Sequence, residues 1–577
     1  MTFAEKCQAI TKDKGSRPDP ERLRGLFDAA WVWQMEVHPE FATYVGYPGH
    51  NDRWTDVSLE AIEERRSLTK TTIEALDSID TAALGPGDLL DYQLFRRQAE
   101  ESLEEHRFHS EYLMLGPFGG PESHMAQLVA MMPASKPDHF SDLVARLDGI
   151  ATALDQTQIL LREGITAGIT SPRVVLRGVP DQISAQLVED PLTSPLLEPF
   201  AKAAEEGVET DRLKREAASI YQSKIRPALE RYREMITGEY IPAAREVIAH
   251  REQPNGEEWY EFLVAKYTTT KLSPKEIHEV GQEEVARLRK LMDEVISSSG
   301  FTGSFDEFTD FLRTDRQFYF EDAEDLLRSY RDICKRADPQ LARLFGKLPR
   351  LPYGVLPVPA YIEKTATTAY YQPGSPEAGR AGYFYANTYD LDSRPKWEME
   401  ALTLHEAVPG HHLQIALSQE LEGLPEFRKH FNATAYIEGW GLYAESLGEE
   451  MDFYQDPYSK FGQLTYEMWR AIRLVVDTGM HALGWGRDEA IEFFKANTGK
   501  TEHDIVVEVD RYISWPGQAL AYKIGEIKLK ELRTRASAEL GDAFDIRAFH
   551  DQVLGQGAMP LDVLEGRIDD WIRDTGK

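Results

Sequence analysis

The dominant pattern along the chain is a helical repeat of apolar positions, three and four residues apart, in segments rich in Glu, Leu, Ala, Arg and Lys. The segments with this pattern are 58–78, 87–110, 138–163, 210–249, 274–298, 396–420, 458–482 and 517–540. The pattern predicts a mainly α protein with two helical lobes and a cleft, in one continuous fold. We expect residues 1–250 to form an N-terminal helical region that makes up part of the cleft. Residues 251–577 are expected to form the catalytic region.

Two segments just before 396–420 depart from the helical pattern. Residues 355–361 and 379–387 combine alternation, aromatic side chains and flanking Pro or Gly, which predicts a small β-sheet beside the following helix. An edge strand at 383–387 would pair with the backbone of an extended peptide, and Asn387 would bond a peptide group. The alternative is a core hairpin rich in aromatic residues.

The segment 396–420 contains the motif HEAVPGHH at 405–412. In the His-Glu-x-x-His helix of zinc peptidases, two histidines four residues apart share one face and bind the metal. Here Pro409 stands four residues after His405, and proline cannot continue a regular helix. If Pro409 and the next residue bulge out as a local insertion, His411 takes the place of the second ligand; His412 is the alternative.

A hydrolytic zinc site also needs a third ligand and a base. Glu438 lies 27 residues after His411, which leaves room for the chain to turn and return, so we predict that it is the third ligand. Glu406, beside the first ligand, is the predicted general base. Glu445, seven residues after Glu438, is a candidate for holding a histidine ring. The alternative is that Glu438 and Glu445 are ordinary solvent-exposed acids on a helix, which are common in a chain this acidic.

Two polar groups of residues follow further downstream. Arg473, Asp477 and His481 share one helix face, as in a buried ion-pair network. Residues 511–525 include a Trp-Pro-Gly start to a helix, followed by Tyr522 and Lys523. A phenol or a guanidinium of this segment would stabilise an oxyanion, and Tyr522 is the predicted phenol. The predicted substrate-binding residues are Arg511, Tyr512, His481 and Asn387.

The composition of the chain limits which binding partners and which cellular compartment are expected. The chain has 65 Lys and Arg against 97 Asp and Glu, a net charge of −32, which disfavours nucleic acid and anionic membrane surfaces. Two cysteines exclude a disulfide framework. Residues 1–8 lack a signal-peptide pattern, and no apolar run is long enough for a bilayer, so we expect a cytoplasmic protein. A homodimer is one assembly that the sequence allows.

Four motifs carry a resemblance to a known family, at 405–414, 438–445, 477–481 and 511–525. They resemble the bacterial family known as domain of unknown function 885 (DUF885), which is grouped with the zincin metallopeptidases. The likeness covers nearly the whole chain, and Pro-Gly-His-His is its specific motif. More remotely, the chain is similar to the helical oligopeptidases related to thimet oligopeptidase and angiotensin-converting enzyme. That resemblance implies a zincin-like fold, a glutamate ligand at Glu438, and a tetrahedral intermediate steadied by Tyr522 or Tyr512.

These observations together predict a zinc-dependent hydrolase of peptide or other amide bonds. One Zn²⁺ per chain would bind to His405, His411 and Glu438, with Glu406 as base, and the substrate would be a short peptide or peptide-like metabolite. The alternatives are a metal-dependent hydrolase or lyase of a non-peptide metabolite, and a catalytically silent binding protein. The presence of Glu406 disfavours the last of these.

Overall fold

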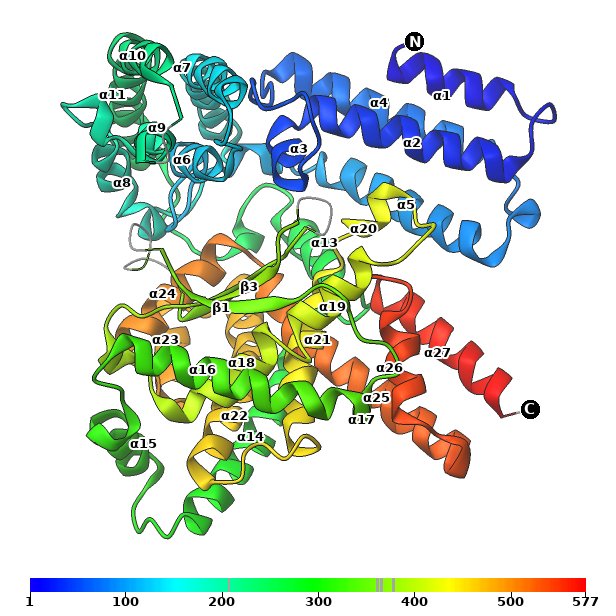
Figure 1. Cartoon of the computed structure of the whole chain (residues 1–577), viewed down its shortest axis with the longest axis vertical. Helices are drawn as coiled ribbons and strands as arrows, with labels where there is room; N and C mark the ends of the chain where they lie inside the picture. The colour runs from blue at the N-terminus through cyan, green and yellow to red at the C-terminus, as the bar shows by residue number, and fades with distance from the viewer. Residues whose placement is uncertain (206–207, 360–362, 364–366, 376–378, 577) are drawn as a thin grey trace. The chain divides into compact units, whose positions relative to one another are not determined.

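A computed structural model describes the chain as a mainly helical protein, as the apolar pattern predicts (Figure 1). The described residues are 1–205, 208–359, 363, 367–375 and 379–576. They divide into unit 1, residues Met1–Gly256 with Pro425–Phe427, and unit 2, residues Glu257–Leu424 with Arg428–Lys577. Among the helices of these residues, none is both long and apolar enough to cross a membrane.

Unit 1 contains the first twelve α-helices. They are α1 (Phe3–Lys12), α2 (Asp19–Val37), α3 (Pro39–Val45), α4 (Leu59–Asp77), α5 (Pro86–Glu105), α6 (Pro121–Met131), α7 (Pro137–Ala167), α8 (Val179–Ala185), α9 (Glu198–Glu205), α10 (Asp211–Ile220), α11 (Arg226–Met235) and α12 (Ile241–Ala243). The helices predicted at 58–78, 87–110 and 138–163 are α4, α5 and α7. The helix predicted at 210–249 is α10–α12, which two π-helical turns join into one rod ending at Ala243.

Unit 2 contains the remaining helices. They are α13 (Gly256–Thr268), α14 (Pro274–Ser298), α15 (Phe305–Thr314), α16 (Ala323–Ala337), α17 (Leu341–Leu344), α18 (Met399–Glu406), α19 (His411–Gln419), α20 (Glu426–Lys429, which begins in unit 1), α21 (Thr434–Ser446), α22 (Pro457–Thr478), α23 (Arg487–Asn497), α24 (Glu502–Ser514), α25 (Ala521–Leu540), α26 (Ile546–Leu554) and α27 (Leu561–Thr575). Three predicted helices are α14, α22 and α25, while the one predicted at 396–420 is divided into α18 and α19.

The centre of unit 2 is α22, which packs along α14. Side-chain caps set where each begins: Ser273 and Glu276 form a reciprocal capping box at α14, and Asp456 accepts two backbone N–H groups at α22. At Gly281 a Cβ atom would lie 2.7 Å from the Cβ of Leu474, so the missing side chain allows the two helices to approach closely. Nearly every residue of α22 is buried, and its side chains reach the other helices of the site.

Helices α21 and α25 run parallel and almost touch. A Cβ on Gly439 would lie 2.5 Å from the Cα of Gly525, so glycine is required at this crossing. Further along both helices, Arg533 donates to the hydroxyl of Tyr443 (3.3 Å), which fixes the parallel direction. Because Glu438 directly precedes the crossing on α21, it lies level with the first turn of α25.

The sheet has three strands, β1 (Tyr353–Pro357), β2 (Ala369–Gln372) and β3 (Gly382–Ala386), in the order β1-β3-β2. Strand β3 pairs parallel with β1 and antiparallel with β2. The expectation that 383–387 is an edge strand is therefore wrong, because neighbours occupy both edges of β3. Strand β2 was not expected from the sequence, and it is the edge strand that contacts α18. Of the strand predicted at 355–361, residues 360 and 361 lie outside the described residues.

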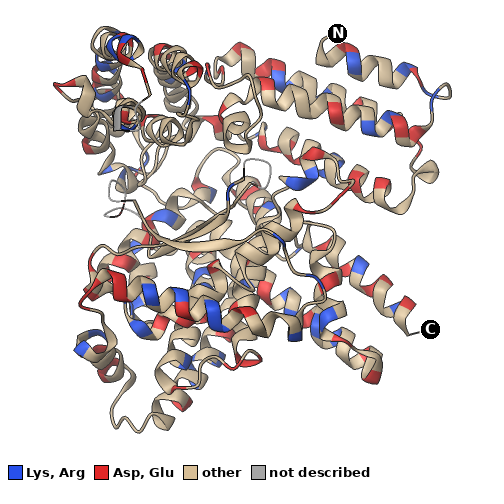
Figure 2. Cartoon of the chain, in the orientation of Figure 1, with Lys and Arg blue, Asp and Glu red and all other residues tan. Residues whose placement is uncertain are grey.

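Charged side chains of both signs lie along the helices of both units (Figure 2). Many are exposed ion pairs one helical turn apart, such as Arg96 with Glu100 at 2.7 Å. Pairs of this kind contribute little to stability, because water and salt screen them. The buried charges of unit 2 are different, since they surround the candidate site.

Candidate metal centre

The break between α18 and α19 sets the positions of the two histidines. Helix α18 ends at Glu406, a cis peptide bond precedes Pro409, and α19 begins at His411. The carbonyl of Pro409 accepts a hydrogen bond from the indole of Trp440 on α21 (2.9 Å). The rings of His405 and His411 meet almost at right angles, with their centroids 4.7 Å apart.

Glu438 of α21 completes a group of three ligand atoms. Its Oε2 lies 3.8 Å from Nε2 of His405 and 3.6 Å from Nε2 of His411, and the three ligand atoms lie within 4.8 Å of one another. These distances are too long for hydrogen bonds. Two ligands of a tetrahedral zinc ion, with bonds of about 2.0–2.1 Å, are separated by about 3.3 Å. The three side chains therefore fit a small ion such as zinc, which they would hold as three protein ligands.

A carboxylate behind the first histidine fixes the orientation of the ring. His405 Nδ1 is 2.8 Å from Oε1 of Glu445, which is completely buried on α21. A proton on Nδ1 leaves the lone pair of Nε2 directed toward the other two ligand atoms. The ring fits because Gly441 has no side chain, since a Cβ there would lie 2.8 Å from Nε2. Glu445 thus occupies the supporting position expected for it.

The electrostatics of the group follow from burial and neighbouring charge. Burial lowers the pKa of His405, but the carboxylates of Glu438 and Glu445 outweigh burial and raise it to about 9. Burial raises the pKa of Glu438, whereas His405 and His411 lower it well below its ordinary value. Without a metal ion, the imidazole of His405 therefore holds a proton and Glu438 is a carboxylate. A bound metal ion would replace the proton on the ligand nitrogen.

His412 points away from this group. Its Nδ1 lies 2.9 Å from the hydroxyl of Tyr371 on β2, and its ring lies 4.6 Å from that of Tyr353 on β1. Burial lowers the pKa of His412 to about 4, so the ring is neutral. Of the two adjacent histidines, the structure brings His411 to Glu438 and packs His412 against the sheet.

The predicted base and oxyanion donor lie close to the three ligands. Glu406 is the last residue of α18, directly after His405, and is partly exposed. Tyr522 is in the first turn of α25, level with Glu438 across the close crossing of α21 and α25. Burial and the negative charge of Glu438 raise the pKa of Tyr522, so the phenol keeps its proton as a donor.

Two of the predicted substrate-binding residues belong to a charged cluster next to Tyr522. The hydroxyl of Tyr512 lies 2.8 Å from Arg473 Nε and 2.5 Å from Glu508 Oε2. Arg511 donates to the same Glu508 oxygen (3.2 Å). Glu508 was not among the predicted site residues, although its spacing of three and four residues from Arg511 and Tyr512 on one helix was a signal for this contact.

The other two substrate-binding candidates bond to the backbone of this chain. His481 Nε2 lies 2.9 Å from the carbonyl of Tyr512. The amide of Asn387 donates to the carbonyls of Glu363 (2.7 Å) and Thr367 (3.2 Å). These contacts hold a helix end and a loop in place, and a role in substrate binding stays a prediction for both residues.

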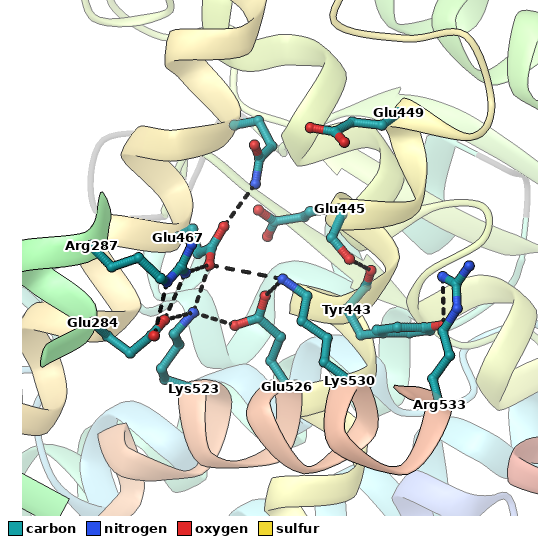
Figure 3. Close-up of polar contacts among 12 residues, drawn as sticks. Glu284, Arg287, Tyr443, Glu445, Glu449, Glu467, Lys523, Glu526, Lys530 and Arg533 are labelled. Atoms are coloured by element: carbon teal, nitrogen blue, oxygen red, sulfur yellow. Dashed lines mark hydrogen bonds and ion pairs between the residues drawn. The ribbon is translucent and has the colours of Figure 1, made fainter. Parts of the chain in front are cut away.

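A second ion network lies along α25 and anchors it to α14 and α22 (Figure 3). Lys523 contacts Glu467 (2.7 Å), Glu526 (2.5 Å) and Glu284 (2.9 Å). The remaining cations of the network are Arg287 and Lys530. Three positive side chains therefore face three negative ones, and this balance is typical of a structural network.

Comparisons with known proteins identify relatives but no established activity. A structure described as that of a candidate lipoprotein from Colwellia psychrerythraea has a TM-score of 0.91 and 26% sequence identity, covering 96% of this chain and 100% of that chain. A second, described as a candidate lipoprotein of unknown function from Shewanella oneidensis, has a TM-score of 0.73 and 16% identity, covering 94% and 99%. No curated protein matches. The model of a family described as bacterial protein of unknown function (DUF885) matches residues 39–568, and the chain therefore belongs to the DUF885 family.

Proposed function

We propose that this protein is a zinc-dependent hydrolase of peptide or other amide bonds. The observation that carries the proposal is the convergence of His405, His411 and Glu438 at ligand spacing, with Glu445 holding the first ring. Two imidazoles and one carboxylate are the ligand set of several catalytic zinc sites. When bound, the ion would supply Lewis-acid chemistry, acidifying water and polarising a carbonyl group.

The chain's own residues would handle the proton and the developing charge. Glu406 adjoins the ligand group, so its carboxylate would take the proton of the attacking water and deliver it to the leaving nitrogen. The phenol of Tyr522 would donate a hydrogen bond to the substrate oxygen as negative charge builds there. Strand β2 is an edge of the described sheet and contacts α18, so an extended substrate would pair with it. Burial of the two histidine ligands favours short substrates over folded proteins.

The proposal is tested with a library of short peptides and amides, digested by the zinc-loaded protein and read by mass spectrometry. We expect hydrolysis by the native protein and a loss of roughly 10²–10⁴-fold in kcat for Glu406→Gln, with zinc still bound. Glu422→Gln is the matched control, because Glu422 is an exposed acid beyond α19. Native activity in the Glu406→Gln protein, or no hydrolysis of any peptide or amide, would contradict the proposal.

A further inference from the structure

Beside Tyr522 lies a group of side chains that we call the guanidinium cluster: Arg473 on α22, with Glu508, Arg511 and Tyr512 on α24. A single oxygen, Oε2 of Glu508, accepts from Arg473 (3.1 Å), Arg511 (3.2 Å) and Tyr512 (2.5 Å). The side chains of Glu508 and Arg511 keep 15% and 14% of their surface exposed, so the cluster borders solvent.

The charges of the guanidinium cluster do not balance. Both arginines stay protonated, and they lower the pKa of Glu508 to about 2 despite its burial, so one carboxylate faces two cations. The next acid, Asp477, is engaged elsewhere, since it accepts from the hydroxyl of Tyr260 (2.6 Å) and the N–H of Gly517 (3.0 Å). Burial also raises the pKa of Asp477 to about 7, which limits its negative charge. The network around Lys523, by contrast, is balanced.

Two N–H groups of the guanidinium cluster have no hydrogen-bond partner among the described residues. They are Arg473 Nη1 and Arg511 Nε, and both atoms are buried. Arg473 as a whole is only 6% exposed. A buried polar group without a partner is destabilising, and more so when it is charged. An acceptor oxygen placed beside either group would satisfy it.

The guanidinium cluster adjoins the proposed catalytic residues through one aromatic ring. The guanidinium carbon of Arg473 lies 4.6 Å from the ring centroid of Tyr522, which holds the ring by a cation–π contact. Tyr522 in turn is level with Glu438 at the crossing of α21 and α25. A substrate group bound by the arginines would therefore lie next to the bond to be cleaved.

We propose that Arg473 and Arg511 bind a substrate carboxylate, so that the substrates are peptides with a carboxylate close to the cleaved bond. This inference rests on the proposed function and names its substrate class. A carboxylate matches the single unbalanced charge and the planar donor geometry of guanidinium. The carboxylate is supplied either by the C-terminus of the peptide or by an Asp or Glu side chain near it.

The test measures binding without turnover, by calorimetry on the zinc-loaded Glu406→Gln protein. The probes are three peptides of equal length: acetyl-Ala-Ala-Ala with a free carboxylate, the same peptide as its C-terminal amide, and acetyl-Ala-Ala-Asp as its C-terminal amide. We expect at least one acid peptide to bind roughly tenfold to a hundredfold more tightly than the uncharged amide, and the better acid identifies the source of the carboxylate. Equal dissociation constants for the three peptides, or no binding of any of them, would overturn the proposal.

Variants assign the preference to the guanidinium cluster. Arg473→Met should abolish the preference for the acid peptide, while Arg473→Lys, which keeps the charge but loses the planar fork, should reduce it. The control is Arg487→Met. Arg487 on α23 forms two hydrogen bonds (2.6 and 3.0 Å) with Asp510 of α24, the helix that carries Arg511, and its replacement should leave the preference unchanged. Arg511→Met provides the same test if Arg473→Met does not fold. A preference that survives in both the Arg473 and the Arg511 variants would overturn the assignment.

The two proposals fail in different ways. If the protein prefers acid peptides but hydrolyses none, the proposed hydrolase function is wrong and the carboxylate site stands. If it hydrolyses peptides with equal affinity for acid and amide, the carboxylate site is wrong and the hydrolase function stands.

Discussion

At the scale of single residues, two neighbouring histidines have opposite environments. His411 faces Glu438 from the start of α19, and His412 faces Tyr371 of the sheet. We therefore expect His411→Ala to lose zinc affinity by several orders of magnitude and His412→Ala to lose less than about tenfold, the low end for a supporting residue. Competition with a chromogenic chelator measures both affinities in one format. The reverse order would show that His412 is the ligand.

The roles of two tyrosines, Tyr512 and Tyr522, can also be distinguished by their different contacts. The hydroxyl of Tyr512 is occupied by Arg473 and Glu508, whereas Tyr522 lies beside Glu438. Tyr522→Phe should lower kcat with little change in KM. The expected rise in activation free energy is at most about 3–4 kcal/mol, as for one lost oxyanion donor. Tyr512→Phe should instead lower stability by about 1–3 kcal/mol, because buried charged partners lose a hydrogen bond.

Steady-state kinetics and thermal unfolding of both Phe variants decide between these roles. If Tyr522→Phe has native kinetics while Tyr512→Phe loses kcat at unchanged stability, then Tyr512 is the oxyanion donor.

At the scale of the elements, the site depends on one close helix approach. The crossing of α21 and α25 brings Glu438 level with Tyr522, and it requires Gly439 and Gly525. In Gly525→Ala, the new Cβ would lie 1.9 Å from the carbonyl oxygen of Ala435, so the helices must separate. We expect a loss of stability of at least about 1–3 kcal/mol, together with weaker zinc binding.

Gly566→Ala is the matched control for this prediction. Gly566 lies within α27 with open space around its Cα, so alanine should raise stability by roughly 0.5–1 kcal/mol through higher helix propensity. Denaturant unfolding and zinc titration of the two variants provide the comparison. Equal stability and equal zinc affinity would show that the crossing does not position the site.

The strand order of the sheet could not be predicted from local sequence patterns. Strand β2 has only four residues, Ala-Tyr-Tyr-Gln, which is too short for an alternating pattern to be recognised. Without β2, the sequence places β3 at an edge. The order of strands is a non-local property, and it decides which strand is available to a substrate.

At the scale of the whole molecule, the predictable features are those that the sequence encodes locally. Helix periodicity located most of the long helices of both units. The Pro-Gly interruption predicted a break in the helix and brought His411 forward as a ligand candidate. The spacing along the chain then made Glu438 the predicted third ligand, and Glu445 a candidate for holding a histidine ring. Each of these features depends on residues within one helix or between consecutive helices.

Partners far apart in the sequence were not predictable. The contact of Trp440 with Pro409, the sharing of Glu508 by two arginines, and the packing of Lys523 against α14 and α22 depend on tertiary folding. A chain with 97 acidic residues offers many alternative partners for each cation. The charge pattern therefore identifies the participants of a buried network only after the helices are placed.

The central claim is that His405, His411 and Glu438 hold one zinc ion per chain. The most direct measurement is elemental analysis of protein purified without added metal, with Glu438→Ala as its partner. We predict about one zinc per chain in the native protein and a near-complete loss in the variant. Peptide hydrolysis by a protein that contains no metal, or full zinc content in Glu438→Ala, would contradict the account.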